Sequence, residues 1–159
     1  MVKTAVLGYG TIGSGVVKVL RDNAKVIAEN AGTQIEVKHV LDLRDLSDTL
    51  VADIWTKDFN DILNDPEVDI VVEVIGGTGA AYTFVKAALE SGKSAVTSNK
   101  ALVAAYGPEL IRIAREKNVN FMFEASVGGG IPIIRPLLRC ITADVICEIT
   151  GILNGTTNY

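Results

Sequence analysis

VKTAVLGYGTIG, residues 2–13, joins a short apolar run to the pattern G-x-G-x-x-G at the start of a stretch with helical period. In this pattern Gly8 permits a tight turn, Gly10 lets a pyrophosphate approach the backbone, and Gly13 lets the helix pack closely on the strand. The unpaired N–H groups and the dipole of the helix start attract an anion. The stretch therefore predicts a strand–turn–helix unit that binds a dinucleotide, with a glycine-rich turn that binds nothing as the alternative.

Beyond this turn, short runs rich in Val and Ile alternate with longer stretches of helical period, which is typical of a parallel sheet covered by helices. We expect strands at residues 2–8, 35–41, 69–75, 94–97, 120–124 and 145–153, and helices at residues 11–29, 59–63, 80–91, 108–117 and 131–141. The predicted fold class is α/β, a Rossmann-type, doubly wound, mostly parallel sheet with helices on both faces. The last expected strand has no following partner, which indicates a longer protein cut after Tyr159.

Composition and charge narrow the possible partners. The 159 residues are 48% hydrophobic with a mean hydropathy of +0.32, as expected of one folded domain and not of a disordered chain. A net charge of −4 without a basic run argues against nucleic acid and anionic membranes as partners. No apolar run has the roughly 18 residues that a membrane helix needs. With only Cys140, Cys147 and His39 as soft ligands, we expect no zinc site, and a cytoplasmic location fits best.

The end of the second expected strand bears on the choice between NAD and NADP. Asp42 lies 29 residues beyond Gly13, later than the usual spacing of about 20. Its carboxylate can accept a hydrogen bond from a ribose 2′-hydroxyl, which favours NAD, whereas Arg44, together with Lys57, can pair with a 2′-phosphate, which favours NADP. A solvated loop position is the alternative for Arg44, and the sequence leaves the cofactor open.

Ligands of an open parallel sheet collect beyond the carboxyl ends of its strands, so the other strand ends are candidate sites. Small residues around Gly76 leave room for ribose and nicotinamide, or form a simple turn. Lys100 follows the fourth strand, and a lysine in a partly desolvated cleft can exchange a proton with a carbonyl oxygen, although most lysines are solvated. After the fifth strand, the glycines at 128–130 free carbonyls that can ligate a monovalent cation or shape a cleft; a hinge between domains is the alternative.

Four motifs in order along the chain resemble homoserine dehydrogenases: GYGTIG at 8–13, TSNK at 97–100, EASVGGGIPII at 124–134 and GILNGTTNY at 151–159. The resemblance runs from the first strand to the last residue. It implies NAD(P)-dependent interconversion of L-homoserine and L-aspartate 4-semialdehyde, on the branch that leads to threonine and methionine.

The resemblance also implies roles for single residues. Those expected at the pyrophosphate are Gly10, Thr11, Ile12 and Gly13. Arg44 is expected near the adenosine 2′ position, and Ser98 and Lys100 beside the nicotinamide and the substrate oxygen. The residues that match a sodium site, mostly through backbone carbonyls, are Glu124, Val127, Gly129 and Ile131. Gly155 and Thr156 match the start of the substrate-binding region.

By the same resemblance, residues 1–131 form the NAD(P)-binding Rossmann domain and residues 132–159 begin a substrate-binding and dimerisation domain. The full-length protein is expected to be a homodimer. Because the rest of that second domain carries further substrate contacts, this chain alone is expected to bind the cofactor but to turn over homoserine poorly or not at all.

Two other classes compete with this interpretation. An aspartate-semialdehyde dehydrogenase needs a nucleophilic cysteine at a strand end, whereas Cys140 falls in an expected helix and Cys147 within an expected strand. A non-enzymatic, dinucleotide-sensing Rossmann domain would use the glycine turn equally well. It would not need Lys100 or the segment 124–132.

Overall fold

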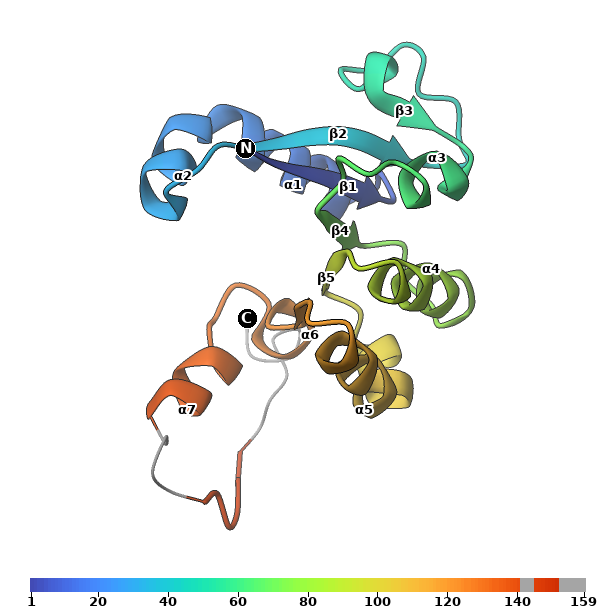
Figure 1. Cartoon of the computed structure of the whole chain (residues 1–159). Coiled ribbons are helices and arrows are strands. Elements are labelled where there is room, and N and C mark those ends of the chain that lie inside the picture. The colour runs from blue at the N-terminus through green and yellow to red at the C-terminus, as the bar shows by residue number, and fades with distance from the viewer. Residues whose placement is uncertain (141–144, 152–159) are drawn as a thin grey trace.

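A six-stranded parallel sheet organises the chain (Figure 1). The structure is a computed structural model that describes residues 1–140 and 145–151. The strand order is β3-β2-β1-β4-β5-β6, and every neighbouring pair is parallel. The chain therefore builds outward from β1 in one direction and then returns to build from β1 in the other. This order is that of a Rossmann fold and confirms the predicted class.

The elements are mostly short. The strands are β1 (Val2–Leu7), β2 (Ile35–Leu41), β3 (Trp55–Thr56), β4 (Ile70–Glu73), β5 (Ser94–Thr97) and β6 (Phe121–Met122). The helices are α1 (Thr11–Asp22), α2 (Ala24–Ala31), the 3-10 turn η1 (Ala52–Ile54), α3 (Phe59–Leu63), α4 (Gly79–Glu90), α5 (Lys100–Glu116), α6 (Ala125–Gly128) and α7 (Ile134–Cys140).

Both faces of the sheet are covered, as predicted. Successive side chains of a strand point to opposite faces, and in β1 they enter different core clusters. Ala5 and Leu7 pack with Ile62 of α3 and Ala88 of α4, whereas Val6 packs with Val17 of α1. All three β1 side chains are fully buried. Burial on both faces explains why the second half of β1, residues 5–7, reads as a continuous apolar run.

The helix expected at 11–29 is two helices. Asn23 interrupts it with φ −107° and ψ 18°, although its N–H still reaches the carbonyl of Val19. Asparagine is a weak helix former because its side chain competes with the backbone for hydrogen bonds, and apolar periodicity alone does not register such a break. The second helix, α2, ends at Gly32 in the left-handed conformation, with φ 70°.

The helix expected at 108–117 begins eight residues earlier, at Lys100. Asn99 caps it, its side chain accepting a hydrogen bond from the N–H of Leu102. The prediction was wrong because Gly107-Pro108 reads as a loop. A proline normally excludes α geometry from the residue before it, but glycine has no Cβ to clash with the ring. Pro108 therefore sits inside the helix, with its side chain at the surface.

The end of the described chain differs most from expectation. Residues 145–151 form no strand, so the expected strand at 145–153 is wrong for its described part, and residues 152 and 153 lie outside the described residues. A β-strand needs a neighbouring strand for its backbone hydrogen bonds, and residues 145–151 pair with none of the described strands. The helix expected from residue 131 begins instead at Ile134. None of the helices among the described residues combines the length and the hydropathy that a membrane-spanning segment requires.

Candidate functional site

The glycine turn connects β1 to α1 at the carboxyl edge of the sheet. Gly8 has a φ of 99°, and its N–H donates to the carbonyl of Leu41 over 2.7 Å. A Cβ on Gly13 would lie only 1.8 Å from the Gly8 carbonyl oxygen, so no side chain fits there. Gly8 and Gly13 are thus required by the backbone geometry of the turn itself.

Gly10 differs, because a Cβ built on it would meet nothing within 4 Å. It is the N-cap residue of α1, and no side chain caps the helix there. The next residues, Thr11 and Ile12, are exposed. The helix start therefore presents uncapped N–H groups to open space, which suits the pyrophosphate of a dinucleotide.

The Asp42 side chain, at the end of β2, points back to the glycine turn. Its Oδ2 accepts a hydrogen bond from the N–H of Tyr9 over 2.8 Å. The Arg44 guanidinium makes a bidentate contact with the same carboxylate: Nε donates to Oδ1 over 2.9 Å and Nη2 donates to Oδ2 over 2.8 Å. The hydrogen bonds from the Arg44 side chain are the main cause that holds the pKa of Asp42 far below its usual range. Asp42 is therefore ionised and largely occupied by protein donors.

Trp55 and Lys57 stand beside this pair. The Trp55 indole Nε1–H donates to the backbone carbonyl of Asp42 over 3.0 Å, and the Lys57 ammonium lies 5.2 Å from the centre of the Trp55 ring. A cleft of about 390 Å³ opens here, lined by the glycine turn, by Asp42, Arg44 and Lys57, and by Ala80 and Phe84 of α4. The structure thus brings Arg44 and Lys57 together at one cleft, as the sequence suggested.

Gly76 follows β4, and its φ of 83° is one that side chains rarely adopt. The N–H groups of Ile75 and Gly76 both donate to Oε1 of Glu73, over 2.8 and 3.2 Å. Glu73 itself is fully buried. Sequence reasoning missed it, although a glutamate within the apolar run of residues 70–75 is the signal that marks it.

Lys100 is the first residue of α5, directly beyond β5. Its side chain is exposed, and Ser98, two residues before it, is half-buried. The positive end of the helix dipole repels a cation at the first position of a helix, so this position is unfavourable for the Lys100 ammonium. The cleft expected to desolvate Lys100 is not formed by the described residues.

Glu124 has a structural partner in α7. Its Oε1 accepts hydrogen bonds from the N–H groups of Ile133 and Ile134, and its Oε2 from the N–H of Arg135. These bonds, with that from Ile133 the largest cause, lower the pKa of the Glu124 carboxyl. The carboxylate is therefore used as the cap of α7.

The other proposed sodium ligands lie in α6 and directly after it. Val127 is in it, Gly129 follows it with a φ of 62°, and the Ile131 N–H bonds to the Gly128 carbonyl. With the Glu124 side chain occupied, a cation would rest on main-chain carbonyls, ligands that hard cations accept. Among residues 1–140 and 145–151, no group of three His, Cys, Asp or Glu side chains can hold a metal. The expected substrate residues Gly155 and Thr156 lie outside the described residues.

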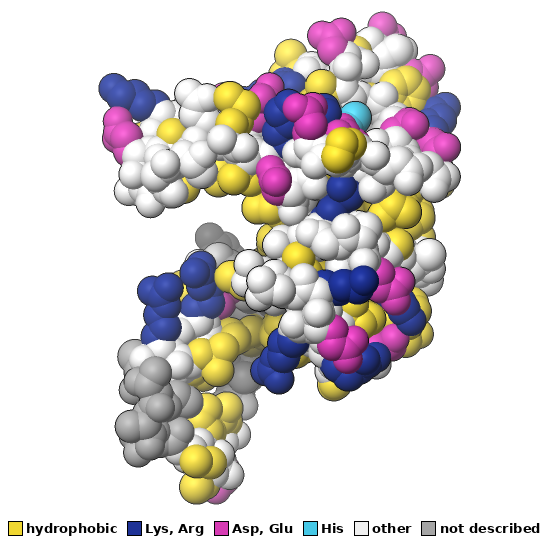
Figure 2. Space-filling model, viewed as in Figure 1, with side chains coloured by type: hydrophobic (Ala, Val, Ile, Leu, Met, Phe, Trp, Pro, Cys, Tyr) yellow, Lys and Arg dark blue, Asp and Glu magenta, His cyan; other side chains and the backbone are white. Residues whose placement is uncertain are grey.

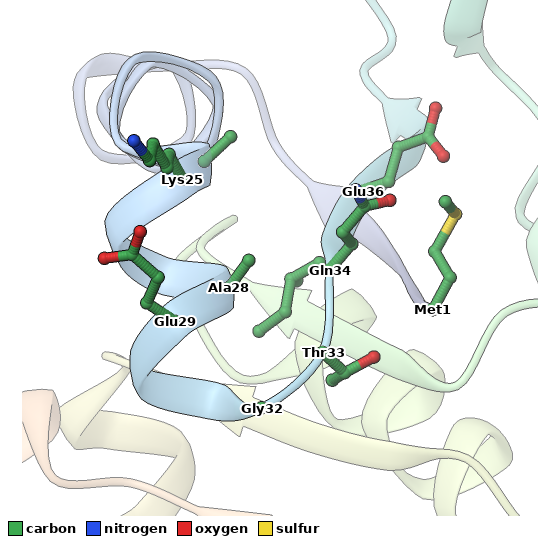
Figure 3. A pocket seen from close by; sticks show the side chains of 10 residues that line it. Met1, Lys25, Ala28, Glu29, Gly32, Thr33, Gln34 and Glu36 are labelled. Carbon is green, nitrogen blue, oxygen red and sulfur yellow. The ribbon is translucent and has the colours of Figure 1, made fainter.

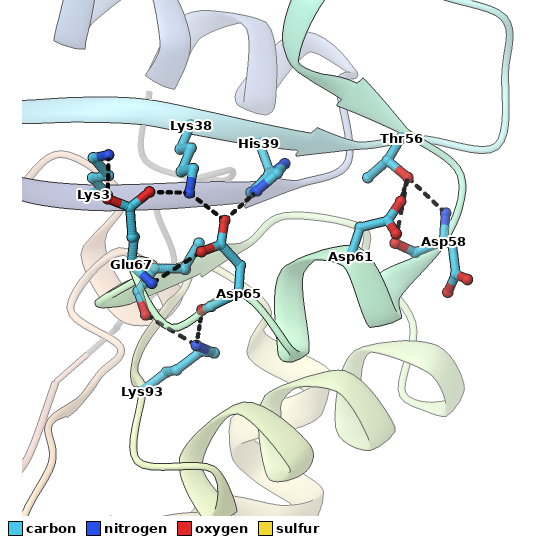
Figure 4. Close-up of polar contacts among 10 residues, drawn as sticks. Lys3, Lys38, His39, Thr56, Asp58, Asp61, Asp65, Glu67 and Lys93 are labelled. Atoms are coloured by element: carbon cyan, nitrogen blue, oxygen red, sulfur yellow. Dashed lines mark hydrogen bonds and ion pairs between the residues drawn. The ribbon is translucent and has the colours of Figure 1, made fainter.

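Two further features lie away from the carboxyl edge. A cavity of about 880 Å³ is lined by Met1, by α2 and by the segment that enters β2 (Figure 3). It adjoins the amino ends of the strands, where ligands of such sheets do not bind. On the other side, His39 donates to or accepts from Asp65 over 2.8 Å within a cluster of ion pairs (Figure 4). His39 therefore has a structural partner and lies outside the edge of the sheet where the candidate site is built.

The chain is similar to known proteins over nearly its whole length. A family model described as "Homoserine dehydrogenase, NAD binding domain" matches residues 8–124. A homoserine dehydrogenase from Bacillus subtilis is 41% identical over 162 residues, which cover 99% of this chain and 37% of that protein. The crystal structure of a homoserine dehydrogenase from Thiobacillus denitrificans matches with a TM-score of 0.82 and 43% identity, over 89% of this chain and 33% of that one.

A hyperthermophilic archaeal homoserine dehydrogenase in complex with NADPH is also similar, with a TM-score of 0.70 and 25% identity over 86% of this chain and 47% of that one. The chain spans little more than a third of the length of the curated relatives it matches.

Proposed function

Since the chain belongs to the homoserine dehydrogenase family and contains its NAD-binding domain, we propose that the protein interconverts L-homoserine and L-aspartate 4-semialdehyde with a nicotinamide dinucleotide. The reaction would serve the synthesis of threonine and methionine in the cytoplasm. The observation that carries the proposal is the convergence of Gly10, Gly76 and Lys100 at one edge of the sheet. Gly10 follows β1, Gly76 follows β4 and Lys100 follows β5, and these three strands are neighbours.

In this proposal the dinucleotide lies along the carboxyl edge of the sheet with its adenosine half at β2 and its nicotinamide half at β4 and β5. The start of α1 takes the pyrophosphate, and the cleft beside Asp42 takes the adenosine half. The nicotinamide half then extends over β4 and β5, toward Gly76, Ser98 and Lys100. A bound nicotinamide supplies or accepts the hydride of the reaction.

We assign NADP as the preferred cofactor. Arg44 and Lys57 place two cations at the adenosine cleft, and Arg44 already neutralises the carboxylate that would repel a 2′-phosphate. The relative from a hyperthermophilic archaeon was solved with NADPH, which supports the same choice. NAD remains the competing cofactor through Asp42.

In this proposal the Lys100 side chain exchanges the proton of the substrate oxygen. When the aldehyde carbon gains a hydride, its oxygen must gain a proton, and an ammonium at that oxygen can hold and donate it. In the oxidative direction the same nitrogen, uncharged, accepts the proton of the homoserine hydroxyl. The substrate would reach Lys100 from the region of Gly155 and Thr156.

Two parts of the proposal concern the complete protein. The carbonyls of Val127, Gly129 and Ile131, next to Glu124, would hold a sodium ion that stiffens the segment between the two domains. We propose the division into residues 1–131 and a second domain from residue 132, through which two copies would form a homodimer.

The test compares Lys100→Ala with Lys117→Ala in the full-length protein. Lys117 is an exposed lysine at the other end of the same helix. We expect Lys100→Ala to lower kcat for homoserine oxidation by about 10²- to 10⁴-fold, the usual contribution of a general acid or base. NADPH affinity should change little, and Lys117→Ala should match the wild type. A wild-type protein without homoserine-dependent reduction of NADP or NAD would contradict the proposal and favour a sensor. A Lys100→Ala variant with full kcat would instead show that Lys100 does not transfer the proton.

A further inference from the structure

A buried hydrogen-bond network ties the ends of β4 and β5 together. Glu73 and Thr97 are the last residues of these strands and are partners in the parallel register. Glu73 is 0% exposed and Thr97 1% exposed, and Asn99, just beyond β5, is buried as well. We call Glu73, Thr97 and Asn99 the strand-end network.

The direction of each bond in the network is determined by its donors. The Asn99 N–H donates to Thr97 Oγ1 over 2.9 Å, and the Thr97 hydroxyl donates to Glu73 Oε2 over 2.6 Å. The other Glu73 oxygen accepts from the backbone N–H groups of Ile75 and Gly76. Glu73 thus links the loop after β4 with the end of β5.

Asn99 closes the network with both ends of its amide. Its Oδ1 accepts the hydrogen bond from the N–H of Leu102 that starts α5. Its Nδ2 donates to the carbonyl of Gly77 over 2.6 Å. The helix that begins with Lys100 is therefore held directly against the Gly76-Gly77 loop.

The place of the network in the sheet gives it a functional meaning. Glu73 also pairs with Leu7 of β1, the residue before the glycine turn, so it stands where the strand order reverses. Dinucleotides cross the sheet at this position. A carboxyl group is costly to bury, and an apolar side chain at the end of β4 would avoid that cost, so stability alone is a poor reason for Glu73 to be there.

We infer that the strand-end network is a positioning device: it fixes Lys100 and the Gly76-Gly77 loop relative to each other, and so sets the nicotinamide half of the cofactor against the proton-transfer group. Glu73, Thr97 and Asn99 are positioning residues and do not themselves react. This inference rests on the proposed function. It predicts that damage to the network affects the nicotinamide half of the site and spares the adenosine half.

Thr97→Val and Thr4→Val are the matched variants for a test in the full-length protein. Both threonines are buried in strands, and both hydroxyls donate a hydrogen bond, that of Thr4 to the Glu36 carbonyl over 3.0 Å. Thr97→Val leaves Glu73 Oε2 without a donor and the Asn99 N–H without an acceptor. Thr4→Val loses one bond at the far end of the sheet and controls for lost stability.

The readouts are kcat and the Kd values of NADPH and of adenosine 2′,5′-bisphosphate, which lacks the nicotinamide half. We expect Thr97→Val to lower kcat and NADPH affinity each by at least about 10-fold, since the variant loses both hydrogen bonds of the Thr97 hydroxyl and each such bond in a buried network contributes up to about that factor. Adenosine 2′,5′-bisphosphate should bind as tightly as to the wild type. Thr97→Ser should restore all three values, and Thr4→Val should leave them unchanged.

A second variant keeps the result decisive if Thr97→Val does not fold. Asn99→Ser retains a residue that caps helices but removes the amide that donates to Gly77. It should reproduce the loss of kcat and NADPH affinity with the adenosine fragment unaffected. Equal behaviour of Thr97→Val and Thr4→Val, or a normal kcat in a folded Asn99→Ser variant, would overturn the inference. A wild type that binds NADPH but does not oxidise homoserine would instead reject the proposed function, and the two Kd values would still test the network.

Discussion

Gly13 has no side chain because the carbonyl of Gly8 occupies the space where one would begin. Gly13→Ala must push apart the turn and α1, since the Cβ would lie 1.8 Å from a backbone oxygen that cannot rotate away. We predict that dinucleotide affinity falls by about 5- to 150-fold, because forced overpacking costs about 1–3 kcal/mol. Titration of NADPH followed by nicotinamide fluorescence measures this.

Gly15 is the control for this change. It also lies in α1, but a Cβ there would meet nothing within 4 Å. Gly15→Ala should retain NADPH affinity and raise the free energy of unfolding by up to about 1 kcal/mol, the difference in helix propensity between glycine and alanine. Equal losses of affinity in both variants would show that α1 tolerates no alanine, and would contradict the specific role of Gly13.

Arg44 decides between cofactors if the proposal is correct. We predict that Arg44→Ala weakens NADPH binding by about 10-fold, as expected for a lost charge-assisted hydrogen bond, and changes NADH binding much less. Parallel titrations with NADPH and NADH at fixed ionic strength measure both values, since a phosphate contact is sensitive to salt.

Arg112 supplies a matched control for Arg44. The two arginine side chains are 62% and 61% exposed, and each forms an ion pair with a nearby carboxylate. Arg112→Ala should leave both affinities unchanged. If Arg44→Ala instead weakens NADH as much as NADPH, the residue acts by holding Asp42 in place and the assignment of NADP fails.

At the scale of elements, a cluster of charges connects the loop between α3 and β4 to β1 and β2 (Figure 4). Asp65 pairs with Lys38 and His39, and Glu67 pairs with Lys3 and Lys38. Hydrogen bonds from Lys38, then from His39, lower the pKa of the Asp65 carboxyl well below its usual range. The ammonium of the buried Lys93 donates hydrogen bonds to the backbone carbonyls of Asp65 and Val68.

The sign of the resulting pH dependence follows from that pKa. A carboxyl whose pKa is lower in the folded state stabilises the fold above the unfolded pKa of about 4, and this stability is lost as the pH falls toward the folded pKa. We predict that Asp65→Asn is less stable than the wild type at pH 7 and that the difference shrinks below about pH 4. Urea unfolding at pH 7, 5, 4 and 3, followed by Trp55 fluorescence, measures it.

Asp22→Asn controls for the loss of a surface charge. Asp22 pairs with Lys18 within α1, where both side chains are exposed and ion pairs contribute little. Its stability difference from the wild type should be small at every pH. A constant deficit of Asp65→Asn across the whole range would mean that shape, not charge, connects this loop to β2.

Elements also show where sequence patterns suffice. The helix α3 has the bounds expected from the sequence, residues 59–63, and in the structure the Asp58 side chain caps it locally. The start of α5 was missed, although Asn99 is an equally local cap, because the Gly107-Pro108 pair outweighed it. Local signals therefore conflict in α5, and only the packing of α5 on α4 resolves the conflict.

At the scale of the molecule, the described residues 131–140 and 145–151 present several apolar side chains to the surface. Ile131 and Leu138 in this part are mostly exposed, as are Val145 and Ile149. Figure 2 shows a hollow between the part that carries α2 and the part that carries α6 and α7. We propose that these apolar side chains pack against the second domain of the full-length protein, because exposed apolar surface often marks a contact with further protein.

We predict that a polypeptide of residues 1–159 binds NADPH but oxidises homoserine at least about 10³-fold more slowly than the full-length protein, since orienting both reactants supplies much of such a rate. Titration and a steady-state assay of the two proteins compare these properties. Activity of the short chain equal to that of the full-length protein would show that the second domain is not needed for substrate binding.

The sequence by itself determined the doubly wound parallel sheet, the glycine turn and the family. These follow from apolar periodicity, from the backbone freedom of glycine and from motifs read along the chain, all of which are properties of neighbouring residues. The same locality led to the errors, such as an unbroken helix across Asn23 and a strand at 145–151, which the structure does not contain.

Only the tertiary structure decided where the polar side chains point. It directs Asp42 to the N–H of Tyr9, Glu124 to the start of α7, and Glu73 to Thr97. In two of these pairs the partners lie 33 and 24 residues apart along the chain. The physical reason is that a buried or half-buried polar group takes the donor that folding brings to it, and that donor is set by the packing of whole elements.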